Sequence, residues 1–136
     1  MLSPNVDTIR LFLHVLAASV WVGGQIVLAG LVPSLRRAAP DAVPVAARAF
    51  ARVAWPAFAI AVVTGLWNQV DIDVANTTTK YQVTLFVKIA LVFSSGGAAA
   101  VHQIGRSRAA LAIGGAVGLL AGLGAMFCGY LLTAGT

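Results

Sequence analysis

Two histidines and a lysine interrupt apolar stretches of this sequence, at positions where charges and metal ligands are rarely found. His14 and Lys88 have apolar residues on both sides, and His102 follows a run of alanine and valine. Ionisable side chains inside a membrane span are costly, so each one is a functional candidate. Imidazole is a ligand of copper and of haem iron. These residues therefore indicate metal or haem chemistry, provided that membrane helices surround them.

The composition places the chain in a membrane. Of its 136 residues, 60% are apolar and 10% are charged, and the mean hydropathy is +0.91. A soluble domain carries about a quarter of its residues as charges. The net charge of +5 comes from basic residues that flank the apolar stretches. Soluble enzymes and nucleic-acid binders are therefore excluded, and the lipid bilayer is the first partner expected.

Four segments are long enough to cross the membrane as helices, because a bilayer core of about 30 Å requires about 20 apolar residues. They cover residues 7–32, 45–70, 80–104 and 109–132. The first is too long for a signal peptide, whose apolar region has about 7–15 residues, and it is expected to end before Pro33. Short links make neighbouring helices antiparallel. We therefore predict an all-α integral membrane protein, an up-down four-transmembrane-helix bundle in a single domain over residues 1–136.

Basic residues are unevenly distributed between the two sides of the predicted bundle. Six arginines lie on the side of the first and third links: Arg36, Arg37, Arg48, Arg52, Arg106 and Arg108. The other side has only Arg10 and Lys80, together with three aspartates. Loops rich in lysine and arginine stay in the cytoplasm. The chain is therefore expected to be a multi-pass protein of a bacterial-type inner (plasma) membrane, with both termini outside.

His14, Lys88 and Met126 are predicted to lie at one depth although they belong to three different helices. Each is roughly six to eight residues from the outer end of its helix, or about 10–12 Å at 1.5 Å per residue. Thr64 lies within about one turn of the same level. His102 lies near the cytoplasmic end, about 20 Å from His14, so the two histidines cannot bind one ion.

Helical spacing also indicates which side chains face the interior. On the first helix, a stripe at intervals of seven and four residues contains His14, Trp21 and Gln25. On the third helix, a heptad line contains Tyr81, Lys88, Ser95 and His102. On the fourth, Met126 continues the four-residue spacing of Gly114, Gly118 and Gly122. Met126 and Cys128 point about 200° apart, so only one of them is expected to face the interior with His14.

Each of these residues also has a simpler explanation. Lys88 could extend its ammonium group to the lipid headgroups, and His14 could be a neutral histidine bonded to Thr64 or to a backbone carbonyl. His102, close to two arginines, is expected at the membrane interface. The arginines themselves are expected to set the topology and to contact headgroups. The glycines of the fourth helix are expected mainly to let helices pack closely.

Three stretches of the sequence resemble the CopD-type copper-resistance membrane domain family. They are LHVLAASVWVGG at 13–24, Phe50-Ala51-Arg52 followed by Thr64-Gly65, and YQVTLFVKIALV at 81–92. Together they extend over the first three predicted helices. The HemJ-type haem-associated membrane proteins look similar in the histidine of the first helix and the lysine of the third, here His14 and Lys88.

The CopD resemblance implies copper handling at the membrane, by binding or permeation, which requires no catalysis. Cu(I) favours thioether, thiolate and imidazole ligands. The candidate metal ligands, at the outer level of the bundle, are therefore His14, Met126 and Cys128. The order and spacing of the three stretches favour this interpretation over the haem one.

The HemJ resemblance implies a haem b site with His14 as the axial ligand. Met126 opposite it would complete a His/Met centre, Lys88 or Arg52 would pair with the haem propionates, and Trp21 would lie beside the cofactor. The protein would then be a haem-dependent oxidoreductase with a redox partner in the membrane, and a homodimer would be a second source of ligands. A third hypothesis is a non-catalytic accessory membrane subunit.

Overall fold

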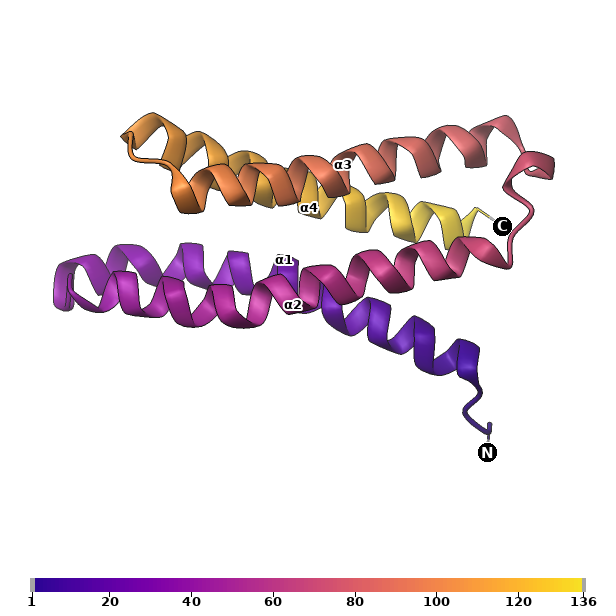
Figure 1. Ribbon diagram of the computed structural model, residues 1–136, viewed down its shortest axis with the longest axis horizontal. Helices are drawn as coiled ribbons and strands as arrows, with labels where there is room; N and C mark the ends of the chain where they lie inside the picture. Colours follow the sequence, from indigo (N-terminus) through magenta and orange to yellow (C-terminus); the bar gives the residue numbers. More distant parts are fainter. Residues whose placement is uncertain (1, 136) are drawn as a thin grey trace. The chain divides into compact units, whose positions relative to one another are not determined.

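The computed structural model describes residues 2–135, and these residues are almost entirely helical. The helices are α1 (Val6–Ala38), α2 (Ala42–Val70), α3 (Thr79–Ile104) and α4 (Arg108–Ala134), with a short 3-10 turn, η1 (Val74–Asn76), between α2 and α3 (Figure 1). By length and apolar composition, all four long helices could cross a membrane. The predicted fold class, an all-α protein with four membrane-length helices, is confirmed.

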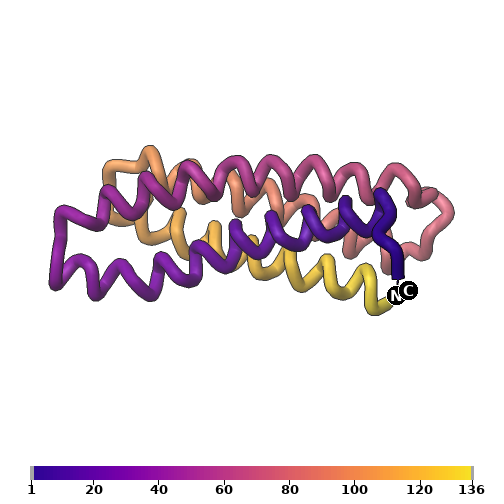
Figure 2. Tube along the Cα trace, turned by 90° about the horizontal axis from the view of Figure 1, so that it is seen from below, coloured from indigo at the N-terminus to yellow at the C-terminus, as the bar shows by residue number. Residues whose placement is uncertain are grey.

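The chain divides into two compact units, Met1–Ile72 and Asp73–Thr136. The first contains α1 and α2 and is called the N-terminal hairpin here. The second contains α3 and α4 and is called the C-terminal hairpin. Within each hairpin the two helices run in opposite directions and contact each other, although the N-terminal part of α1 diverges from α2 (Figures 1 and 2). The expected single domain over the whole chain stays a prediction.

The first helix is longer than its sequence suggests. It begins after Asn5, whose side-chain oxygen accepts a hydrogen bond from the Thr8 amide at 2.8 Å. It then continues through Pro33 to Ala38, so the predicted end before Pro33 was wrong. A proline removes one backbone donor, but membrane helices tolerate this loss where neighbouring groups compensate for it. Two arginines in the last turn also suit the negative end of the helix dipole.

The second helix begins earlier than predicted, at Ala42 instead of residue 45. Pro44 lies in its first turn, where the backbone N–H groups have no partner within the helix, so proline is acceptable there. The third and fourth helices start after the side-chain caps Thr78 and Ser107, which accept hydrogen bonds from Tyr81 N and Ala110 N. Their bounds match the predicted segments to within two residues.

An aromatic cluster forms the core of the N-terminal hairpin. The Trp21 ring on α1 lies 5.3 Å from the Trp55 ring and 4.5 Å from the Phe58 ring, measured between centroids. Trp21 is buried, as are Ala54 and Ala57 on the facing side of α2. Small residues on α2 therefore make room for the large indole of α1.

The C-terminal hairpin is held by close contact of the two backbones. A Cβ atom on Gly114 would lie 2.9 Å from the Ala98 carbonyl oxygen and 2.9 Å from the His102 nitrogen, so only glycine fits. One turn further along α4, the Ser95 hydroxyl donates a hydrogen bond to the Gly118 carbonyl at 2.7 Å. Small residues thus bring α3 and α4 together, as is typical of membrane helices.

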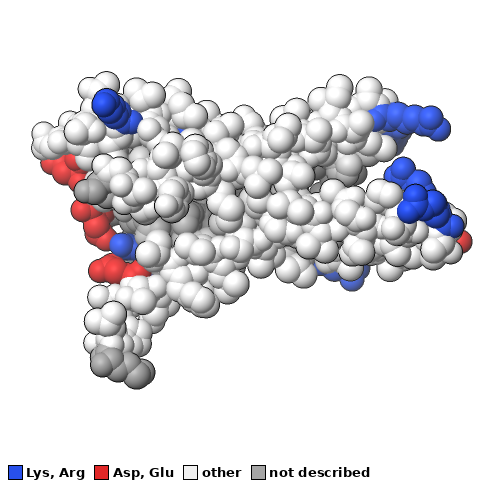
Figure 3. Space-filling model, turned by 180° about the vertical axis from the view of Figure 1, so that it is seen from behind, with Lys and Arg blue, Asp and Glu red and all other residues white. Residues whose placement is uncertain are grey.

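The surface of the helices is apolar over most of their length. Many leucine, valine, isoleucine and phenylalanine side chains are exposed on all four helices. On the face that Figure 3 draws, most charged side chains lie toward the two ends, and one basic patch lies further inward. This distribution suits helices whose central parts lie in hydrocarbon and whose ends lie at the polar interface.

Candidate functional site

His14 is fixed by the facing helix of its own hairpin. Its Nδ1 atom lies 2.9 Å from the Ala61 carbonyl oxygen and 3.1 Å from the Thr64 hydroxyl. That hydroxyl donates its own proton to the Ile60 carbonyl at 2.6 Å, so its oxygen accepts from the imidazole. Because a carbonyl can only accept, Nδ1 carries the proton. When the imidazole is neutral, its lone pair is therefore on Nε2.

The backbone of α2 is shaped to accommodate this imidazole. A Cβ atom on Gly65 would lie 2.9 Å from His14 Cε1, which is too close for the ring to stay in place. The adjacent Thr64 is buried, with 6% of its surface exposed. The Thr64-Gly65 pair therefore supplies both a hydrogen-bond partner and space for the ring.

Arg10, one helical turn before His14, makes a second polar contact across the hairpin. Its Nη1 atom lies 2.7 Å from an Asp71 carboxylate oxygen at the end of α2, and its Nη2 atom 3.1 Å from Asp7. The guanidinium carbon is 5.5 Å from the centre of the Trp67 ring. The Arg10 side chain is only 10% exposed, and its Nε atom has no hydrogen-bond partner among residues 2–135.

Arg10 and His14 are four residues apart, so they lie on one face of α1. With Thr64 and Asp71 on α2 they form what we call the polar seam of the N-terminal hairpin. From the sequence, Arg10 was predicted only to lie on one side of the membrane, and the polar seam was not predicted. The spacing of Arg10 from His14 was the available signal, but the pairing with Asp71 depends on how the two helices are rotated.

The other candidates of the N-terminal hairpin lie elsewhere. Trp21 belongs to the aromatic cluster, and its carbonyl oxygen accepts a hydrogen bond from the Gln25 side chain at 3.0 Å. It is seven residues from His14, about 10 Å along the helix axis. Arg52 is exposed on α2 and is not part of the polar seam.

Lys88 lies against α4 within the C-terminal hairpin. Its Nζ atom is 3.3 Å from the position that a Cβ on Gly129 would take, so the absence of a side chain there leaves room for the ammonium group. It is also close enough to Cys128 for an electrostatic interaction. Lys88 is only partly buried.

The orientation of Met126 differs from the prediction. The buried positions of α4 are Gly114, Gly118, Ala121, Gly122, Ala125, Cys128 and Leu132. Met126 is 40% exposed, whereas Cys128 is 9% exposed. Each four-residue step rotates about 40° beyond a full turn, so the line that begins at Gly114 has turned by about 120° at residue 126. Cys128, and not Met126, therefore lies on the buried face.

His102 is an exposed residue in the last turn of α3. Its Nδ1 atom is hydrogen-bonded to the Leu111 carbonyl oxygen of α4. Its ring also lies beside Gly115, where a Cβ would be 3.1 Å from Nδ1. His102 therefore joins the two helices near their connecting loop, as expected for a residue at the end of the span.

The predicted metal ligands belong to different hairpins. His14 lies in the N-terminal one, and Met126 and Cys128 lie in the C-terminal one. Within the described part of the chain, no group of three or more His, Cys, Asp or Glu side chains is arranged to hold a metal ion. Binding of copper by His14, Met126 or Cys128 stays a prediction.

No family model matches the chain, and neither a curated protein nor a solved structure matches it.

Proposed function

We propose that this protein handles copper in a membrane, with the Nε2 atom of His14 as a ligand for Cu(I). The observation that supports this most directly is the hydrogen bond from His14 Nδ1 to the Ala61 carbonyl. Metal-ligating histidines usually donate their other ring N–H to a carbonyl or carboxylate, which fixes the tautomer and orients the ring. The resemblance of the first three helices to CopD-type proteins favours copper as the metal.

The charge of the polar seam also suits a cation. Arg10 contributes one positive charge, but Asp7 and Asp71 contribute two negative charges within 3.1 Å of its guanidinium. The net charge around Arg10 is therefore negative, one turn from His14. A monovalent copper ion would approach this end of the hairpin without repulsion from the arginine.

Cys128 replaces Met126 as the candidate for a soft ligand. A thiolate suits Cu(I) at least as well as a thioether, and Cys128 is buried where Met126 is exposed. The exposure of Met126 argues against the haem b alternative, because a His/Met centre requires a methionine that faces the interior. Cys128 is in the other hairpin, so its role is tested by a variant of its own.

In this proposal the protein spans the membrane four times. The loops 39–41 and 105–107, with the arginines beside them, lie in the cytoplasm according to the positive-inside rule. The membrane is then a bacterial-type inner membrane, and copper would be captured from the outer side.

The test is Cu(I) binding to the purified protein in detergent, measured by competition with a chromophoric chelator under reducing conditions. His102→Ala is a matched control, because the Nδ1 atom of each histidine donates to a backbone carbonyl. We expect His14→Ala to weaken binding at least tenfold and His102→Ala to leave it within twofold. Cys128→Ser is expected to weaken binding, whereas Met126→Leu is not.

Other outcomes would contradict the proposal. Equal binding by the wild type and His14→Ala would exclude His14 as a ligand. A Soret band in the purified protein, with iron and without copper, would instead support the haem alternative. If neither metal binds and His14→Ala only lowers stability, the accessory-subunit hypothesis is the one that survives.

A further inference from the structure

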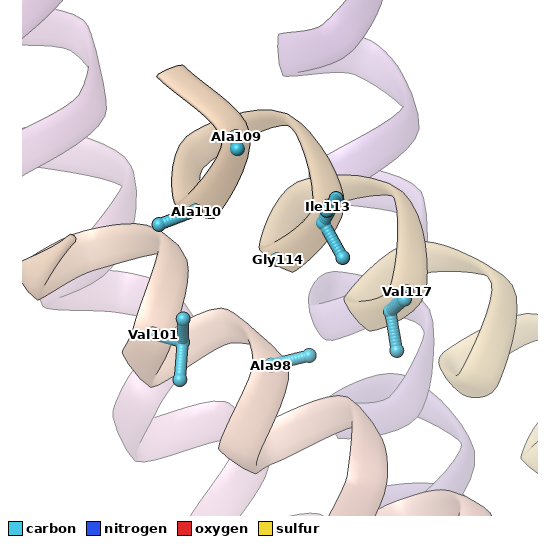
Figure 4. A pocket seen from close by; sticks show the side chains of 7 residues that line it. All are labelled: Ala98, Val101, Ala109, Ala110, Ile113, Gly114 and Val117. Atoms are coloured by element: carbon cyan, nitrogen blue, oxygen red, sulfur yellow. The ribbon is translucent and has the colours of Figure 1, made fainter. Parts of the chain in front are cut away.

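A groove lies between α3 and α4, near the loop that connects them. Its volume is about 300 Å³, and its walls are formed only by alanine, valine, isoleucine and glycine residues. Figure 4 shows Val101 and Ala98 on α3 and Ile113 and Val117 on α4 around the same space. The groove belongs entirely to the C-terminal hairpin and contains none of the proposed copper ligands.

The groove arises from the close contact of the two helices. Gly114 and Ala98 bring the backbones together at its floor, where no larger residue fits. Val101, Ile113 and Val117 are exposed and form its rim. The groove is therefore open on one side of the C-terminal hairpin.

Its length and shape suit a single hydrocarbon chain. The lining residues of α4 extend from Ala109 to Val117, which is about 12 Å along the helix axis. A second helix is about 10 Å wide and could not enter a space of this volume. Small polar molecules would find no hydrogen-bond partner among the side chains that line it.

Positive charge is concentrated at the loop end of the groove. Arg106 and Arg108 lie directly before Ala109, and both are exposed. Neither arginine forms an ion pair with a carboxylate within residues 2–135. Arg108 is also the first residue of α4, where the helix dipole favours a negative charge.

We propose that this groove binds an anionic glycerophospholipid, with one acyl chain in the groove and the phosphate at Arg106 and Arg108. Basic pockets between membrane helices are known to bind anionic headgroups. Here the apolar groove adds selectivity for a molecule that has both a phosphate and a hydrocarbon chain. The proposal does not depend on copper binding, because no residue is shared.

The first test is native mass spectrometry of the full-length protein, incubated in detergent with equimolar phosphatidylglycerol and phosphatidylcholine. The double variant Arg106→Gln/Arg108→Gln removes the headgroup contact. The matched control is Arg36→Gln/Arg37→Gln, which removes two arginines near the loop of the other hairpin. We expect the first variant to lose at least fivefold of the bound phosphatidylglycerol and the control to lose less than twofold. Equal losses in both would show that only general surface charge attracts the lipid.

A second pair of variants tests the groove itself. Val117→Trp places a large ring in the groove, whereas Leu120→Trp places it on another exposed part of α4. Circular dichroism checks that both variants keep their helices. We expect Val117→Trp alone to lower phosphatidylglycerol binding at least threefold. Unchanged binding in Val117→Trp would overturn the proposal that an acyl chain occupies the groove.

Discussion

At the scale of single residues, the position of the His14 ring depends on the absence of a Cβ atom at Gly65. Replacing Gly65 with alanine puts a Cβ 2.9 Å from His14 Cε1, so the ring must move away from the Ala61 carbonyl. We expect Gly65→Ala to lower the free energy of unfolding by about 1–3 kcal/mol, as overpacking usually does. It should also weaken Cu(I) binding. Thermal unfolding and chelator competition on the same sample measure both effects.

Gly30→Ala is the control for this variant. A Cβ on Gly30 meets nothing within 4 Å, and alanine favours the helix over glycine by about 0.5–1 kcal/mol. We therefore expect Gly30→Ala to be neutral or slightly stabilising, with unchanged copper binding. Equal stability and equal copper binding in the two glycine variants would show that the contact between Gly65 and His14 affects neither property.

The two carboxylates beside Arg10, Asp71 and Asp7, should contribute different amounts to the free energy of unfolding. Asp71 joins α2 to α1, whereas Asp7 is on the same helix as Arg10, three residues away. Exposed pairs at this spacing contribute about 0.2–0.5 kcal/mol. Asp71 is 60% exposed, but it partners a guanidinium that is only 10% exposed, so we expect Asp71→Asn to cost about 1 kcal/mol.

Thermal unfolding of Asp71→Asn and Asp7→Asn at low and high salt checks this prediction. The difference between the two variants should shrink at high salt, because salt screens exposed charges. A larger loss of stability in Asp7→Asn would contradict the view that Arg10 holds the two helices together.

At the scale of helices, one hydrogen bond distinguishes two neighbouring serines of α3. Ser95 is 1% exposed and donates to Gly118 O on α4, whereas Ser94 is exposed and donates to Ala90 O on its own helix. Hydrogen bonds between membrane helices contribute about 0.6 kcal/mol on average and up to about 1.7. We expect Ser95→Ala to destabilise the protein by about 1 kcal/mol and Ser94→Ala to have no effect in the same unfolding assay. Equal effects of the two variants would mean that the hydrogen bond from Ser95 to α4 does not contribute to stability.

The helices themselves could be predicted from the sequence because their length is set by the membrane. Their ends were less certain, since nothing in the sequence shows whether a chain continues through a proline such as Pro33. Which residues share one face of a helix could be predicted only over short stretches of sequence. Met126 was placed on the wrong face because each four-residue step along a helix rotates about 40° beyond a full turn. Over the twelve residues from Gly114 to Met126 this rotation adds up to about 120°.

The candidate site was predicted in part. A bond from His14 to Thr64 or to a backbone carbonyl was the simpler explanation of this residue, and both contacts are found. The Arg10–Asp71 pair was not expected, because two residues sixty-one positions apart can meet only for one rotation of α1 against α2. Periodicity within one helix carries no information about that rotation.

At the scale of the whole molecule, the proposal of four membrane spans predicts that the two arginine-rich loops lie on one side of the membrane. Single cysteines in a Cys128→Ala background test this with a maleimide that does not cross membranes. We expect Asn5→Cys and Thr77→Cys to react in intact cells, and Ser34→Cys and Ser107→Cys to react only after the cells are opened. The reverse pattern would mean that the protein is inserted with its termini in the cytoplasm. Reaction of all four cysteines in intact cells would exclude four spans.

The division into two hairpins also has a consequence for how the protein is made. Most contacts of α1 are with α2 and most contacts of α3 are with α4, so each helix pairs mainly with a neighbour in the chain. A ribosome releases α1 and α2 first, and domains generally fold as units during synthesis. His14 can therefore reach Ala61 and Thr64, and Arg10 can reach Asp71, before the C-terminal hairpin is complete. The polar groups of the N-terminal hairpin can therefore be hydrogen-bonded or ion-paired within the membrane before the C-terminal hairpin is synthesised.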